Sequence, residues 1–170
     1  MDLKQNKDRP NRAEERACFM ALEKGDIDTV KDFINQYGVD APVDDGTCLH
    51  QAIFHENYEL VNFLISAGAN PDALYENRIT PLIAAIDLKQ WDIATLLVEK
   101  GANVNLKDGA SNSALSKAIF HYNGDDKLIK LLLSKGADPF QDLLNGYKPI
   151  DLARSMNLTE ILKLLTNEKT

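Results

Sequence analysis

The sequence is poor in the residues that metal, redox and disulfide sites require. Its 170 residues include two cysteines and three histidines, and two cysteines do not make a disulfide framework. His50, His55 and His121 are not grouped with cysteines at a zinc-binding spacing, and no glycine-rich phosphate loop is present. We therefore expect no metal, no cofactor and no catalytic residues, which makes an enzyme the least favoured function. Cys18 and Cys48 lie among apolar residues and are expected to be buried, reduced thiols.

The sequence also lacks long apolar runs and an excess of positive charge. No run approaches the ~18–20 apolar residues that a membrane span needs, and the first ten residues lack the apolar core of a secretory signal. A net charge of −7 and a pI near 4.9 argue against nucleic acid as a partner, because its binders carry a basic face. We expect a cytoplasmic protein whose charge permits a basic partner, although moderate negative charge also simply favours solubility.

A short segment recurs at intervals of roughly 33 residues, a period typical of stacked repeats. Each copy is followed by an apolar run, and three of these runs end at Gly68, Gly101 and Gly136. The four copies are Thr47-Cys-Leu-His-Gln-Ala52, Thr80-Pro-Leu-Ile-Ala-Ala85, Ser113-Ala-Leu-Ser-Lys-Ala118 and Lys148-Pro-Ile-Asp-Leu-Ala153. Such a period predicts a solenoid, whose usual product is an extended binding surface rather than a catalytic pocket.

The third unit shows the pattern of one repeat. Thr80 can cap free amides, and Pro81 is compatible with the first helical position, where its missing N–H is not needed. Apolar residues at spacings of three and four then predict a short first helix, and the run from Ile93 to Val98 predicts a second. Gly101 is expected to end that helix with a positive φ.

Helix, turn, helix, glycine and loop at this period resemble the ankyrin repeat. The resemblance covers nearly the whole chain and implies an all-α solenoid of helix-turn-helix units with hairpin-like loops. Five alanines, one in each first helix, mark the units: Ala21, Ala52, Ala85, Ala118 and Ala153. The first and last units are expected to act as caps of the stack. We predict a charged tail at 1–10 and one domain at 11–166, with units at about 11–41, 42–73, 74–106, 107–140 and 141–166.

The resemblance implies that partners bind to a concave face formed by the first helices. The positions late in those helices read Phe54-His55, Asp87-Leu88 and Phe120-His121. Apolar anchors beside polar groups resemble interface hot spots, so we predict Phe54, Leu88 and Phe120 to be partly exposed at equivalent places. The alternative is that the phenylalanines tilt into the stack and complete the core. For His50, the resemblance implies a structural hydrogen bond.

The loops are expected to project beside this face as fingers that share in binding. Their candidate binding residues are Tyr75, Glu76, Asn77, Ile79, Asp108, Asn112, Leu144 and Tyr147. Acidic residues recur along the same edge, at Asp44, Asp45, Asp72, Glu76, Asp108, Asp138 and Asp142. Such an edge suits a basic partner, whereas local bonding within hairpin turns is the alternative for Asp108 and Asp138.

Together these features favour a protein–protein interaction module, expected to be a monomer when free. The alternative within the same surface is a stoichiometric inhibitor or immunity protein that occludes a basic enzyme or toxin. An assay of the partner's activity would separate the two.

Overall fold

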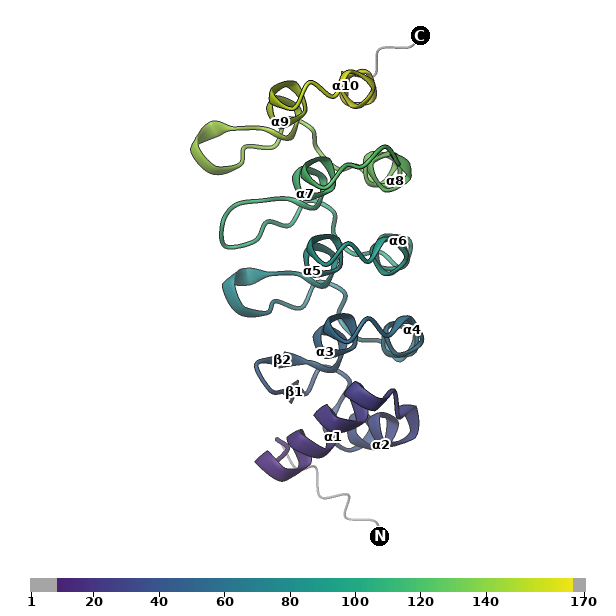
Figure 1. The fold of residues 1–170 in the computed structure, drawn as a ribbon. Coiled ribbons are helices and arrows are strands. Elements are labelled where there is room, and N and C mark those ends of the chain that lie inside the picture. The colour runs from purple at the N-terminus through teal and green to yellow at the C-terminus, as the bar shows by residue number, and fades with distance from the viewer. Residues whose placement is uncertain (1–8, 167–170) are drawn as a thin grey trace.

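The computed structural model describes residues 9–166, which form ten α-helices stacked as five antiparallel pairs (Figure 1). Most of the predicted tail at 1–10 lies outside these residues. The predicted all-α solenoid is confirmed. The helices are α1 (Arg12–Lys24), α2 (Ile27–Tyr37), α3 (Cys48–Phe54), α4 (Tyr58–Ser66), α5 (Pro81–Asp87), α6 (Trp91–Glu99), α7 (Ala114–Phe120), α8 (Lys127–Ser134), α9 (Pro149–Ser155) and α10 (Thr159–Thr166). We number the pairs one to five along the chain.

Helices of the third pair begin and end at residues suited to cap them. The Thr80 hydroxyl accepts a hydrogen bond from the amide of Ile83 at 3.2 Å, and Pro81 occupies the first position of α5. The second helix of the same pair ends before Gly101, whose φ of 94° favours glycine. Both features agree with the prediction for this unit.

The loops that precede α3, α5, α7 and α9 project from one side of the column, and we call them the fingers (residues 42–47, 74–79, 107–112 and 142–147). The first contains the two short strands of the described chain, β1 (Pro42–Val43) paired antiparallel with β2 (Gly46–Thr47). The second and fourth contain 3₁₀ turns at Glu76–Arg78 and Leu144–Gly146. In these two fingers the amides of Tyr75 and Leu143 donate to the carbonyls of Ile79 and Tyr147, so their backbones match.

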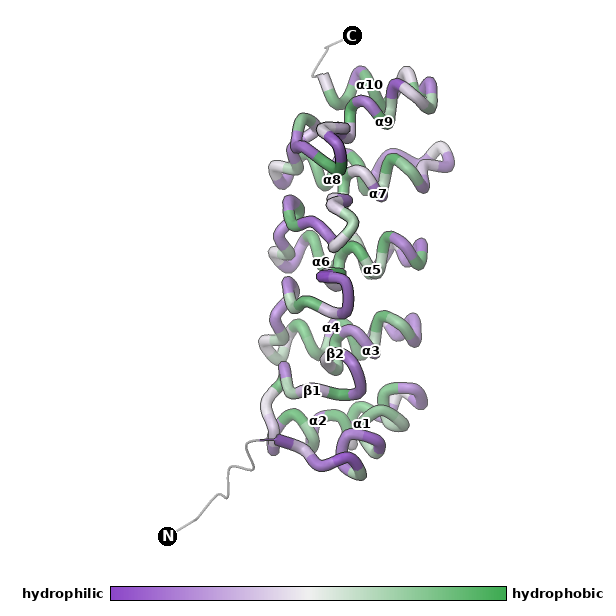
Figure 2. Tube along the Cα trace, turned by 90° about the vertical axis from the view of Figure 1, so that its left-hand side faces the viewer, coloured by the Kyte–Doolittle hydropathy of each residue, from purple (hydrophilic) through white to green (hydrophobic). Residues whose placement is uncertain are grey.

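Small residues allow the first helices of neighbouring pairs to approach closely. The five anchor alanines are all buried, at 0–5% exposed, and a larger side chain at such a site typically costs about 1–3 kcal/mol. Figure 2 shows hydrophobic residues in the helices of every pair and hydrophilic residues in most turns that join them. No helix within residues 9–166 is long and apolar enough to cross a membrane.

Hydrogen bonds also join the bases of successive fingers. A carboxylate oxygen of Asp72 accepts the amide of Asn103 at 2.8 Å, and the side-chain oxygen of Asn105 accepts the amide of Asp138 at 3.0 Å. The carboxylate of Asp138 in turn accepts the amide of Phe140 within its own loop at 2.8 Å. Asp72, counted above in the acidic edge, therefore joins two units of the stack, whereas the carboxylate of Asp138 is engaged within its own loop.

Candidate functional site

The fingers of pairs three, four and five each lie against the finger or first helix of the preceding pair, and we call each such contact region a seam. The corresponding positions of a seam can be counted from the anchor alanine of its first helix. In the seam between pairs two and three they are Gly46, His50 and Phe54 from pair two, and Tyr75 from the next finger. The same positions hold different residues in the next two seams, so the three can be compared directly.

The seam between pairs two and three is filled by an aromatic ring. The ring of Tyr75 lies 5.2 Å from that of Phe54 in an edge-to-face arrangement and 5.5 Å from that of His50. A Cβ atom added to Gly46 would lie 2.9 Å from the Tyr75 ring, so the ring occupies the space that glycine leaves. Phe54 retains 37% exposure, which makes it an edge of this aromatic cluster rather than a free anchor.

His50 has a structural place beneath this cluster. Its Nδ1 atom lies 3.0 Å from the hydroxyl of Thr47, and its side chain is fully buried. Burial lowers the pKa of His50, and the nearby backbone of Ala73 and Ile79 opposes that shift. The imidazole therefore has a structural role: it is hydrogen-bonded to the finger of its own pair and packs on the ring of Tyr75 from the next one.

The seam between pairs three and four is closed by charged groups. The Nζ atom of Lys117 lies 2.9 Å from Asp87 and 3.7 Å from Asp108, and Nε2 of His121 lies 3.4 Å from Asp87. Three of the predicted binding residues are thus brought together. Their polar atoms already contact one another, which leaves them less available to a partner.

Asp108 also organises its own finger. Its carboxylate accepts hydrogen bonds from the amides of Ala110 at 2.9 Å and Asn112 at 2.8 Å, and from the Asn112 side chain. The side chain of Asp108 is only 8% exposed. The geometry is therefore that of the turn-bonding alternative, as it is for Asp138.

The seam between pairs four and five is open. Its corresponding positions, Asn112, Ser116, Phe120 and Leu143, border a cleft of about 470 Å³. The finger of pair five adds more apolar surface, since Leu144 and Tyr147 line the same cleft. Phe120 is 61% and Leu144 60% exposed. The remaining residues of the lining are Lys117, Asn145 and Leu152.

The helix ends correct one expected equivalence. Phe54, Asp87 and Phe120 are the last residues of α3, α5 and α7, whereas Leu88 follows α5 as its C-cap. Leu88 therefore corresponds to His55 and His121 rather than to the two phenylalanines. It is exposed, but it does not continue the row that they define.

The remaining predicted residues lie near the second finger. Asn77 adopts a left-handed φ of 53° at the tip, and its carbonyl accepts the amide of Gly109 from the next finger. Ile79 is half-buried against the core. Glu76 is exposed, with Asp44 and Asp45 of the previous finger nearby. The pKa of Tyr75 is raised, first by desolvation and then by these three negative charges.

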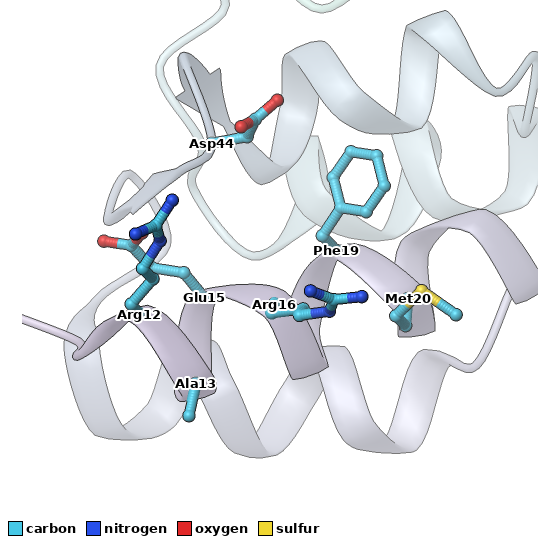
Figure 3. Close-up of a pocket in the computed structure, with 7 residues that line it drawn as sticks. All are labelled: Arg12, Ala13, Glu15, Arg16, Phe19, Met20 and Asp44. Atoms are coloured by element: carbon cyan, nitrogen blue, oxygen red, sulfur yellow. The ribbon is translucent and has the colours of Figure 1, made fainter.

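A second cavity, of about 580 Å³, lies at the N-terminal end of the column (Figure 3). Helix α1 contributes six of the residues drawn there, and Asp44 reaches it from the first finger. Two guanidinium groups, Arg12 and Arg16, face a site that also contains the carboxylates of Glu15 and Asp44. This cavity is lined by both positive and negative side chains, whereas the cleft between pairs four and five is mainly apolar.

The sequence placed Leu143 at a finger tip, but it did not assign Ser116 or Leu152 to the binding surface, and all three line the cleft. The signal that could have identified Leu143 and Ser116 as part of it is their register, because they correspond to Tyr75 and His50. Trp91 borders a third cavity with Tyr122 of the turn in pair four. Within the described chain no three His, Cys, Asp or Glu residues gather as a metal site would require.

Comparison with known proteins identifies the family. A model described as ankyrin repeats in three copies matches residues 17–108, which is more than half of the chain. The chain belongs to the ankyrin-repeat family. Ankyrin repeats are protein-interaction modules, so the cleft and fingers belong to a scaffold of that class.

Three relatives illustrate how widely the scaffold is used. A putative ankyrin repeat protein of fowlpox virus, FPV014, is 34% identical over 86% of this chain. The nuclear factor NF-kappa-B p105 subunit of Gallus gallus is 38% identical over 69% of the chain. The RelA-associated inhibitor of Mus musculus is 37% identical over 51%. The matched regions span 34%, 13% and 11% of these relatives, respectively.

Proposed function

We propose that this ankyrin-repeat chain binds a protein partner through its fingers and first helices, and that the cleft between pairs four and five takes an apolar side chain of that partner. The observation that carries the proposal is the exposure of Phe120, Leu144 and Tyr147 around one cleft of about 470 Å³. Aromatic side chains that become packed into a desolvated pocket at an interface are frequent hot spots. We expect the protein to act in the cytoplasm as a monomer.

The charges near the second finger favour a basic segment in the same partner. Asp44, Asp45 and Glu76 form no ion pair with another residue of the chain between 9 and 166. They lie two seams away from the apolar cleft, a separation of roughly 20 Å at ~10 Å per helix pair. An extended peptide covers that span with about six residues. The proposed partner segment therefore presents basic side chains about six residues from a large apolar one.

The test is capture of partners from the native host with three forms of the protein. Phe120→Ser removes the proposed anchor, and Tyr58→Ser removes an exposed aromatic ring of similar size from the outer helix α4. Proteins retained by the original chain and by Tyr58→Ser, but lost with Phe120→Ser, support the proposal. Equal retention by all three would reject the cleft as the binding site.

A stoichiometric inhibitor is the second candidate function. The unpaired acidic group at the fingers favours it, because such a surface suits the basic active site of an enzyme. One relative carries the name RelA-associated inhibitor. Once a partner is in hand, its activity should fall to zero at one equivalent of this protein if the chain inhibits. Unchanged activity of the partner in the saturated complex would show that the chain binds it without inhibiting it.

A further inference from the structure

The two cysteines of the chain meet across the boundary between the first two helix pairs. Cys18 lies on α1 and Cys48 begins α3, and their sulfur atoms are 3.7 Å apart. Both thiols are free, with exposures of 1% and 0%. Two sulfur atoms at contact distance need to approach only to ~2.05 Å to form a bond. Neither thiol belongs to the seams or to the cleft described above.

The register of the repeats explains how the thiols meet. Cys18 stands three residues before the anchor alanine of its helix, and Cys48 stands four before the next one. The same two positions at the later boundaries hold side chains that cannot be cross-linked, namely Leu49 with Pro81, Leu82 with Ala114, and Leu115 with Pro149. Only the boundary of the N-terminal pair carries cysteine at both positions.

We propose that Cys18 and Cys48 are a site of oxidative modification, an intramolecular disulfide that ties the N-terminal helix pair to its neighbour. The oxidant is a low-molecular-weight disulfide such as oxidised glutathione. One cysteine thiolate attacks a sulfur of the oxidant, whose S–S bond breaks and releases one thiol. The second cysteine then attacks the mixed disulfide and releases the other thiol. The protein loses two protons and two electrons, and the oxidant leaves as two thiols.

We expect the reaction to start from an opened state, because both thiols are buried away from a soluble oxidant in the closed one. The contact between the two thiols and their burial both raise the pKa of Cys48, so the reactive thiolate is disfavoured in the closed state. The first helix pair should open at a lower free-energy cost than the inner pairs, since a terminal unit of a solenoid contacts a neighbour on one side alone. Oxidation should therefore report the opening of α1 and then prevent it.

The test treats the full chain with oxidised glutathione and measures its intact mass. The expected product is a monomer lighter by about 2 Da, the two hydrogens lost, with both thiols protected from alkylation after denaturation. Cys18→Ala and Cys48→Ala should each form only a glutathione adduct or a dimer; if one fails to fold, the other serves alone. An unmodified chain, or a stable adduct in place of the internal bond, would overturn the proposal.

A second pair of variants tests the opening step without touching either thiol. The Asn11 side chain accepts the amides of Ala13 and Glu14 and caps α1, so Asn11→Ala should speed oxidation about five-fold. Thr80→Ala removes a comparable cap from α5 in pair three and should leave the rate nearly unchanged. Equal acceleration by both variants would contradict opening at the first pair. The disulfide should raise the melting temperature by roughly 5 °C above that of the reduced protein. A melting temperature below that of the reduced protein would show that the bond strains the two helices apart and would contradict the proposed tie.

Discussion

The seam between pairs two and three and the seam between pairs four and five share a backbone but not a surface. In the first, Tyr75 packs edge-on against Phe54; in the second, Leu143 stands where Tyr75 would be, and Phe120 borders a cleft. The exposed fraction of the phenylalanine rises from 37% to 61%. A finger residue, together with the space left for it on the preceding unit, therefore distinguishes the closed seam from the open one, and the repeat scaffold can vary its binding surface without changing its fold.

The two phenylalanines should respond oppositely to replacement by serine, which is the largest effect we expect. Phe120→Ser should leave the free energy of unfolding within about 0.5 kcal/mol and weaken partner binding by about 2–4 kcal/mol, as truncation of a hot spot does. Phe54→Ser should lower stability by about 1–2 kcal/mol through loss of the aromatic pair, with a smaller effect on binding. Denaturant unfolding and titration calorimetry give both quantities.

The reverse pattern would show that Phe120 belongs to the core and that the partner binds elsewhere on the fingers. Unfolding of the variant carrying both serines would carry the same meaning, because a mainly exposed ring at pair four should add little to the cost at pair two.

Gly46→Ala should open the closed seam. The added Cβ would lie 2.9 Å from the Tyr75 ring and 3.2 Å from Cβ of His50, so the ring must leave Phe54. We expect a loss of about 1–2 kcal/mol of stability and a more solvent-exposed tyrosine by fluorescence quenching. Asn112→Ala, the corresponding change beside the open cleft, is the control and should not expose a tyrosine. If Tyr75 keeps its environment in Gly46→Ala, the seam is not closed by this ring.

Gly101→Val tests the stack that supports both seams. The glycine has a φ of 94° and no atom within 4 Å of an added Cβ, so the cost is conformational rather than steric. We expect about 1–3 kcal/mol of lost stability, shared with neighbouring pairs because they stabilise one another. An unchanged melting curve would mean that this helix stop tolerates a β-branched residue.

Neutral replacements of the three acidic residues near the closed seam should have the smallest effect. Asp44→Asn, Asp45→Asn and Glu76→Gln together should slow association with the partner several-fold, and less so at high salt. The dissociation rate should barely change. Asp72→Asn is the matched control, because its carboxylate accepts a hydrogen bond within the stack. A slower association that persists at high salt would argue against electrostatic attraction.

The sequence predicted the fold well because its signals are local. The anchor alanines, the Thr80-Pro81 start and the stop at Gly101 each act within one helix or turn, and they recur in phase. The binding surface was less predictable, because it depends on contacts between units. Whether Phe54 is covered is decided by Tyr75 in the next finger and by the space left at Gly46. Asp108 was counted in the exposed acidic edge, but its carboxylate is engaged in hydrogen bonds within its own turn and is nearly buried.

The most direct test of the account is the partner's affinity for Leu143→Tyr. This change places in the open seam the residue that fills the closed one, on a finger backbone with the same hydrogen bond between its ends. It is made in a chain that also carries Asn112→Gly, because Asn112 stands where Gly46 leaves room for the Tyr75 ring. We predict a loss of affinity of at least about ten-fold, equivalent to 1.4 kcal/mol, with stability unchanged or higher. Leu143→Met, which conserves size and apolar character, should bind normally. Full affinity in Leu143→Tyr, with its ring packed on Phe120, would contradict the claim that the partner occupies this cleft.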